Sequence, residues 1–241
     1  MKDKLKFALK PLYKDMLKSV GQSDIRAFCV QWGKDFPQEE RTGILFVGKA
    51  TNGWLSKSTD VDALFEDPSK RIFNRDDQVE WIEKNQNNNK KTKGDYNANS
   101  SAFLRLMRSV SSSYYSKPRG WSSMVAWSNL YKVAPAKGNP SEKMKKAQVE
   151  HYKKILKAEI EILSPKYVIF FTSGWADEFI RFLNGNEPTK SFEKETWGKD
   201  YEIKAYNIGG VICINTQHPQ GKKEEEHLSA IKRIIDKIEK S

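Results

Sequence analysis

Four short runs of apolar residues alternate with stretches of helical periodicity along this chain. The runs lie at 44–48, 125–131, 167–172 and 211–215. Uninterrupted apolar runs of this length are typical of strands buried on both faces. Because such strands alternate with helices, the pattern predicts an α/β protein: a three-layer α/β/α fold with a central four-stranded parallel sheet.

Apolar residues spaced three and four apart predict the helices. These predicted helices cover 3–20, 99–115, about 140 to 163, and about 224 to 240. The third is expected to start at Pro140 with Asn139 as its N-cap. Pro11 is expected to kink or split the first helix.

The rest of the N-terminal region and one long loop complete the predicted organisation. Phe28, Trp32 and Phe36 are four apart, so residues 1–40 are predicted to form an N-terminal helical segment. Residues 85–97 are rich in Asn and Lys and are expected to form an exposed loop. No internal repeat or linker divides the chain, which predicts a single domain over 1–241.

The last apolar run leads directly into a polar tip. Residues 215–219 read Asn-Thr-Gln-His-Pro. Polar residues just past a parallel strand lie at the carboxyl edge of the sheet, where open α/β folds bind ligands. Pro219 keeps His218 out of the helical region, so the imidazole is expected on a stiff turn. A surface histidine in an ordinary turn is the alternative.

A glycine-flanked loop follows the first strand. Gly48 and Lys49 lead into Asn52, Gly53 and Trp54. Backbone amides of such a loop can approach an anion or a flat ligand. It is not a Walker A loop, because Gly53 is followed by Trp rather than by Lys-Ser or Lys-Thr. A tight strand-to-helix turn is the alternative.

Asn129 is an amide inside an otherwise apolar strand. A buried amide without partners costs about 1–3 kcal/mol. Either backbone groups satisfy Asn129, or it is available to a ligand.

Composition adds a partner class and removes several others. The net charge is +11 and the pI about 9.4, which favours a polyanionic partner such as nucleic acid, although a merely Lys-rich surface is common. Cys29 and Cys213 have no metal-site spacing. No run approaches the roughly 18 apolar residues of a membrane span. We expect a cytoplasmic monomer that binds no metal and no membrane.

The order of four motifs resembles the uracil-DNA glycosylase superfamily. The motifs are the strand and loop 44–53, the segment 127–140 with Asn129 and a Pro-rich loop, the segment 161–176 with Ser164-Pro165-Lys166, and His218-Pro219. The middle two are most similar to the thermophilic and bacterial branch. The likeness covers roughly residues 40–235, and it lies in order and spacing rather than in any single motif.

The resemblance implies a DNA repair enzyme of base excision. Such a hydrolase extrudes a damaged base from DNA into a pocket and breaks its N-glycosidic bond. Asn129 corresponds to the residue that reads the base edge, and His218 to the donor of a hydrogen bond to the base oxygen. Gly48 and Lys49 belong to the base-binding loop, and Trp54 is expected to stack on the base. Lys222 and Lys223 are expected to contact the DNA backbone.

Two departures from the family pattern leave the activity open. Lys49 and Ala50 occupy the places of the residue that orients the attacking water, and Asn52 is the nearest polar substitute. The Pro-rich branch often carries an iron–sulfur cluster on four cysteines, which two cysteines cannot supply, so no cofactor is expected.

Two other functions remain open. A catalytically inactive protein that binds a nucleobase, a nucleotide or nucleic acid is favoured by Lys49 and Ala50. A nucleotide enzyme that cradles phosphate with 48–53 is less favoured, because the loop lacks the Lys-Ser/Thr pair.

Overall fold

A computed structural model describes residues 1–21, 24–37, 41–51, 60–66, 73, 79–87, 98–115 and 120–240. Its elements are, in chain order, α1 (Lys2–Val20), β1 (Ile25–Ala27), β2 (Gln31–Trp32), β3 (Ile44–Ala50), α2 (Val61–Phe65), α3 (Glu80–Asn87), η2 (Ala98–Ser100), α4 (Ala102–Tyr114), η3 (Trp121–Met124), β4 (Val125–Tyr131), β5 (Val133–Pro135), α5 (Glu142–Leu163), β6 (Tyr167–Phe171), η4 (Ser173–Ala176), α6 (Asp177–Leu183), β7 (Glu193–Trp197), β8 (Tyr201–Ile208), β9 (Val211–Thr216) and α7 (Glu224–Glu239).

The α/β class is confirmed, but the sheet differs from the prediction. Within the described residues the main sheet has seven strands in the order β2-β4-β3-β6-β9-β8-β7. The four apolar runs form β4, β3, β6 and β9, which are adjacent and pair in parallel. β2 pairs antiparallel with β4, and β8 and β7 continue the other edge antiparallel. The sheet is therefore mixed rather than composed of four parallel strands.

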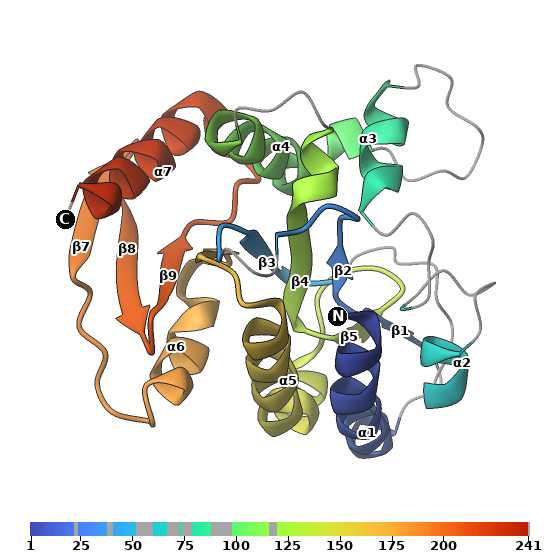
Figure 1. Cartoon of the computed structure of the whole chain (residues 1–241). Coiled ribbons are helices and arrows are strands. Elements are labelled where there is room, and N and C mark those ends of the chain that lie inside the picture. Colours follow the sequence, from blue (N-terminus) through green and yellow to red (C-terminus); the bar gives the residue numbers. More distant parts are fainter. Residues whose placement is uncertain are drawn as a thin grey trace.

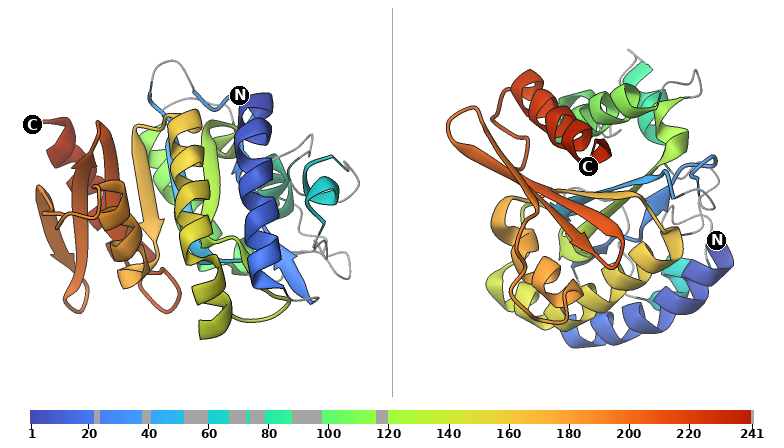
Figure 2. Two further views of the ribbon diagram at one scale, coloured as in Figure 1. Left: turned by 90° about the horizontal axis from the view of Figure 1, so that it is seen from below. Right: turned by 60° about the vertical axis from the view of Figure 1, so that its left-hand side comes forward.

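Helices cover both faces of this sheet (Figures 1 and 2). One face packs on α1, α5 and α6 through side chains such as Leu45, Val168 and Cys213. The other face packs on α4 and α7 through Phe46, Ile169 and Ile214. Successive strand residues point to opposite faces, so the apolar runs have both faces buried. This explains their lack of polar alternation.

The prediction of a helix within 22–40 is wrong. β1 pairs with β5 and β2 with β4 in this region, and the backbone N–H of Phe28 donates to Lys132 O at 2.8 Å. A spacing of four is even, so it also places side chains on one side of an extended chain. The aromatic spacing therefore did not distinguish a helix from strands.

Two details of the predicted helices also differ. Pro11, which is exposed, does not split the first helix, because α1 continues through it as one helix. The N-cap of α5 is Ser141 rather than Asn139, and its side chain accepts from Met144 N at 3.3 Å. Of the loop predicted at 85–97, residues 85–87 belong to α3, and 88–97 lie outside the described residues.

A buried ion pair joins Lys132, the residue between β4 and β5, to α5. Lys132 Nζ donates to Glu159 Oε2 at 2.7 Å, and both side chains are fully buried. Ser128 Oγ donates to the same oxygen at 2.6 Å, and Lys132 also donates to Ser128. The pair lies on the α5 face of the sheet, opposite the face of Asn129.

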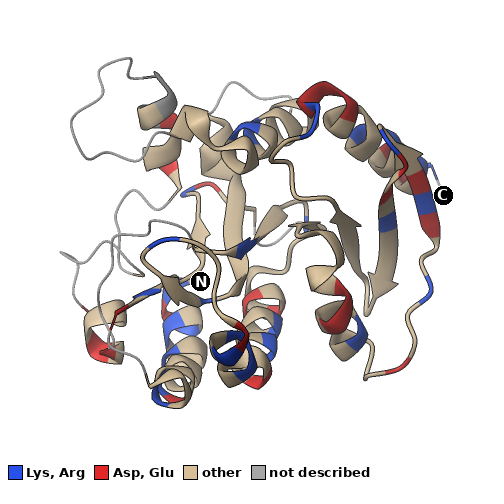
Figure 3. Ribbon diagram, turned by 180° about the vertical axis from the view of Figure 1, so that it is seen from behind, with Lys and Arg blue, Asp and Glu red and all other residues tan. Residues whose placement is uncertain are grey.

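The charged surface is mixed along the helices. Figure 3 shows basic and acidic residues interspersed on α1, α5 and α7. No described helix is both long and apolar enough to span a membrane.

Candidate functional site

The chain changes direction across the sheet between β3 and β6. In the sheet, β3 is followed along the chain by β4 on one side of it, whereas β6 is followed by β9 on the other side among the parallel strands. β3 and β6 are neighbours in the sheet. The point where the strand order reverses is the switch point, where open α/β folds bind ligands.

Gly48 and Asn129 lie opposite one another at this edge. They are register partners on β3 and β4. A Cβ at position 48 would overlap Asn129 Oδ1 and lie 3.4 Å from the Phe103 ring. The missing side chain of Gly48 thus makes the space that the Asn129 amide occupies.

The Asn129 side chain keeps an unused donor. The residue is 2 % exposed, and its Nδ2 has no hydrogen-bond partner in the described part of the chain. Thr51, just after β3, likewise has a buried Oγ1 without a partner there. Unpaired buried polar atoms are costly, which favours a ligand as their partner.

His218 is fixed by hydrogen bonds from two sides. Its backbone N–H donates to Ser173 Oγ at 3.2 Å, and Ser173 donates to Gln217 Oε1 at 3.1 Å. The backbone N–H of Gln220 donates to His218 Nδ1 at 3.3 Å. Since Nδ1 is the acceptor, the proton of the neutral ring is on Nε2.

The surroundings of His218 keep it neutral. Burial, followed by the charges of Lys49 and Lys222, lowers the pKa of His218 to about 4. At neutral pH the imidazole is therefore uncharged, and Nε2–H is a neutral donor at the carboxyl end of β9.

Trp175, which follows β6, lies beside Lys49 at the carboxyl edge of the sheet. Lys49 Nζ lies 4.9 Å from the centre of its ring, and Lys145 Nζ from α5 lies 4.3 Å from it. Tyr131, at the end of β4, packs against Trp175 edge-to-face at 5.6 Å. Side chains from the ends of β3 and β4 and from α5 thus lie around the Trp175 indole.

Burial, together with Lys222 and Lys145, lowers the pKa of Lys49. Lys222 lies 5.0 Å from the centre of the Tyr201 ring. Because Lys49 and Lys222 also act on His218, the β3 end and the β9–α7 connection contribute to one positively charged region.

The predicted site residues divide into three groups. Gly48, Lys49, Asn129, His218 and Lys222 lie at the carboxyl edge, as described above. Lys223 is exposed, immediately precedes α7 and pairs with Glu226 at 2.7 Å. Asn52 and Trp54 lie outside the described residues.

Four further residues of this region were not predicted as site residues: Ser173, Trp175, Lys145 and Thr51. Ser173 and Trp175 follow the end of β6 just as His218 follows β9, so the rule that selected His218 also applies to them. Ser173 has a left-handed φ of 57°, which sequence alone does not indicate. Lys145 comes from the first turns of α5, and its position depends on helix packing.

The first residue of α6, Asp177, also supplies a carboxylate. Asn215 Nδ2 donates to Asp177 Oδ1 at 2.8 Å. Burial raises the pKa of Asp177. Asn215 is a register partner of Phe170, on the α6 face of the sheet, so Asp177 lies on the face opposite to Asn129.

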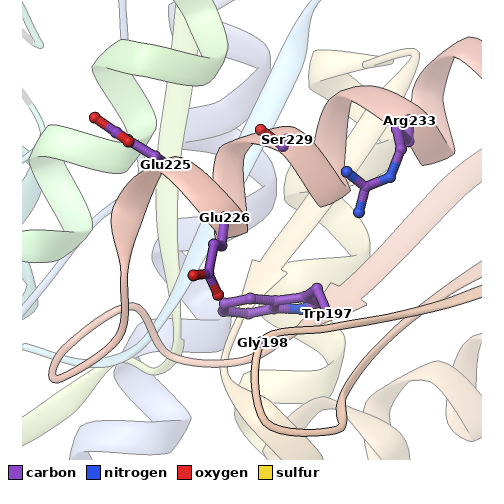
Figure 4. A pocket seen from close by; sticks show the side chains of 6 residues that line it. All are labelled: Trp197, Gly198, Glu225, Glu226, Ser229 and Arg233. Carbon is purple, nitrogen blue, oxygen red and sulfur yellow. The ribbon is translucent and has the colours of Figure 1, made fainter.

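A separate surface hollow of about 460 Å³ lies on α7 (Figure 4). It is lined by Trp197, Gly198, Glu225, Glu226, Ser229 and Arg233. None of the predicted site residues lines it, and two carboxylates make it unsuited to an anion. Within the described residues, no group of three His, Cys, Asp or Glu side chains is placed to hold a metal ion.

No protein-family model matches the chain, and no curated protein has a significant match to it. The interpretation of the site therefore rests on its geometry and on the motif order described above.

Proposed function

We propose that this protein is a uracil-DNA glycosylase-like hydrolase. It cleaves the N-glycosidic bond of uracil, or of another damaged base, after that base has left the DNA stack. The observation that carries the proposal is His218, a neutral Nε2–H donor at the carboxyl edge of the sheet that also holds the unpaired Asn129 amide.

The strand order supports the same proposal. The resemblance implies a four-stranded parallel sheet between helices. We assign β4, β3, β6 and β9 to that core and regard β2, β7 and β8 as additions at its edges.

The chemistry follows from charge development on the departing base. As the glycosidic bond breaks, its electron pair moves onto the base, and His218 Nε2–H stabilises the charge on the base oxygen. A preorganised donor of this kind contributes about 2.7–4 kcal/mol to transition-state stabilisation. Lys49 adds a positive charge close to His218. Water then supplies hydroxide to C1′, and its proton goes to the base.

A second function is favoured by the end of β3. Residues 44–51 contain no carboxylate, and Lys49 and Ala50 occupy the water-orienting places. A protein that binds a nucleobase, a nucleotide or nucleic acid without cleaving it satisfies the same geometry around Asn129 and His218.

Uracil-containing oligonucleotides test the proposal. Single- and double-stranded substrates are incubated with the protein and then cleaved with alkali. Strand breaks are expected with the wild type and a loss of about 10²–10³ in rate with His218→Ala. Asn129→Ala is expected to weaken binding and rate together.

The same variants separate the two functions. Calorimetry that detects uracil or nucleotide binding, without strand breaks from any modified base at high protein concentration, identifies the binding protein. The absence of both binding and cleavage contradicts both functions.

A further inference from the structure

Three half-buried lysines from distant parts of the chain surround the candidate site. Lys49 is the penultimate residue of β3, Lys145 lies in the first turns of α5, and Lys222 lies between β9 and α7. Lys49 and Lys145 both lie within 5 Å of the centre of the Trp175 ring. Lys222 is close enough to lower the pKa of both Lys49 and His218.

Their pairing differs from that of the buried lysines. Lys153, whose side chain is 9 % exposed, pairs with Glu150 at 3.0 Å and Glu178 at 2.8 Å. Lys132 pairs with Glu159. Within the described part of the chain, Lys49 and Lys222 have no carboxylate at ion-pair distance. Lys145 has Glu142 at 2.7 Å, and that carboxylate is 78 % exposed.

This arrangement is unfavourable without an anion. Partly buried like charges raise one another's free energy, because the local dielectric is lower than that of water. An anion among the three ammonium groups removes the repulsion and supplies the missing partners.

We propose that Lys49, Lys145 and Lys222 form a phosphate-binding subsite beside His218 and the Trp175 ring. A phosphate suits compact ammonium groups, which bind as point charges. The existence of the subsite does not depend on catalysis. The identity of its ligand as the phosphate of the nucleotide whose base binds at Asn129 and His218 rests on the proposed function.

Two consequences distinguish this subsite from a merely basic rim. The protein should prefer a nucleotide to the corresponding nucleoside. Bound phosphate should also raise the pKa of His218, because it neutralises two of the charges that lower it.

The first experiment uses inorganic phosphate and the full chain. Calorimetry at constant ionic strength, with chloride as the reference anion, is expected to detect phosphate binding to the wild type. Lys49→Met and Lys145→Met should each weaken it at least tenfold. Lys157→Met is the matched control, because it removes the same charge from an exposed position of α5. Absent binding, or equal binding by all three variants, overturns the subsite.

The second experiment compares deoxyuridine with deoxyuridine monophosphate. The wild type is expected to bind the nucleotide at least tenfold more tightly, and Lys145→Met should abolish this difference while retaining nucleoside binding, because Lys145 has no part in base binding. Equal affinity of the wild type for both overturns the subsite.

These results are independent of the oligonucleotide assay. Base release without phosphate binding removes the subsite and leaves the glycosylase proposal standing. Phosphate binding without base release supports the subsite and contradicts the glycosylase proposal. His218 imidazole resonances, followed by NMR, should show the upward pKa shift on phosphate binding, and no shift counts against the subsite.

Discussion

At residue 48 the backbone leaves room for a neighbouring amide because glycine has no Cβ. The side chain of Asn129 fills that room, and its Nδ2 has no partner within the described residues. The position of the Asn129 amide therefore depends on the absence of a Cβ at residue 48 of β3. A substitution at Gly48 tests this dependence without removing any polar group.

We predict that Gly48→Ala destabilises the protein and weakens base binding. The added methyl group overlaps Asn129 Oδ1, and Phe103 at 3.4 Å limits movement in the other direction. Overpacking of this kind costs about 1–3 kcal/mol. Urea unfolding measures the stability, and titration with uracil or a uracil-containing oligonucleotide measures the binding.

Gly174→Ala is the matched control for this prediction. Its Cβ would lie 3.5 Å from Asp177 Oδ2, which is ordinary contact, in the same edge region of the sheet. Its stability should stay within about 0.5 kcal/mol of the wild type. If Gly48→Ala behaves like Gly174→Ala, the close approach of Gly48 and Asn129 is wrong.

Among the elements, the parallel strands were predictable because burial on both faces leaves a direct trace in the sequence. The strand predicted at 125–131 coincides with β4, and those at 44–48, 167–172 and 211–215 differ from β3, β6 and β9 by no more than two residues at either end. Their carboxyl ends also located His218 and Asn129.

The edge strands were harder to predict from the sequence, for a physical reason. β2 is two residues long, and its partner on β4 is about 95 residues away in the chain, so no local pattern marks the pairing. Lys145 and Trp175 were missed similarly. Their proximity depends on how α5 and α6 pack, which neither residue's neighbours in sequence encode.

The ion pair between Lys132 and α5 gives a prediction at this scale. Glu159→Gln should destabilise the protein by about 3–5 kcal/mol, because Lys132 then keeps a buried charge without its carboxylate. Urea unfolding of the full chain measures the change.

The double variant Lys132→Met, Glu159→Leu is the control. It removes both charges and fills similar volumes, so most of the lost stability should return. Equal destabilisation by the single and double variants would mean that packing, rather than charge, makes this contact important.

For the whole molecule, the half-buried His218 and the buried His227 connect the site to stability. Burial lowers the pKa of His218 to about 4 and that of His227 to about 3. Thr216 Oγ1 lies 2.9 Å from His227 Nε2, and the His227 ring stacks on Trp197 at 4.2 Å. Both histidines, His218 just after β9 and His227 on α7, are therefore uncharged in the folded protein at neutral pH.

We predict that the free energy of unfolding falls as the pH decreases from about 6.5 towards 4. In this range the unfolded chain binds protons at histidines of ordinary pKa, about 6.5, whereas folded His218 and His227 stay neutral. Stability from these groups is therefore complete above about pH 6.5 and is lost as the pH falls towards their folded pKa values. Urea unfolding at half-unit pH intervals measures the slope. Replacing both histidines by glutamine should flatten the curve between pH 6.5 and about 5 relative to the wild type, because the carboxylates are the same in both proteins and the difference between the two curves comes from the histidines. An unchanged slope in that variant would show that these histidines are not neutral in the folded protein, and a charged His218 would remove the neutral donor on which the proposed chemistry depends.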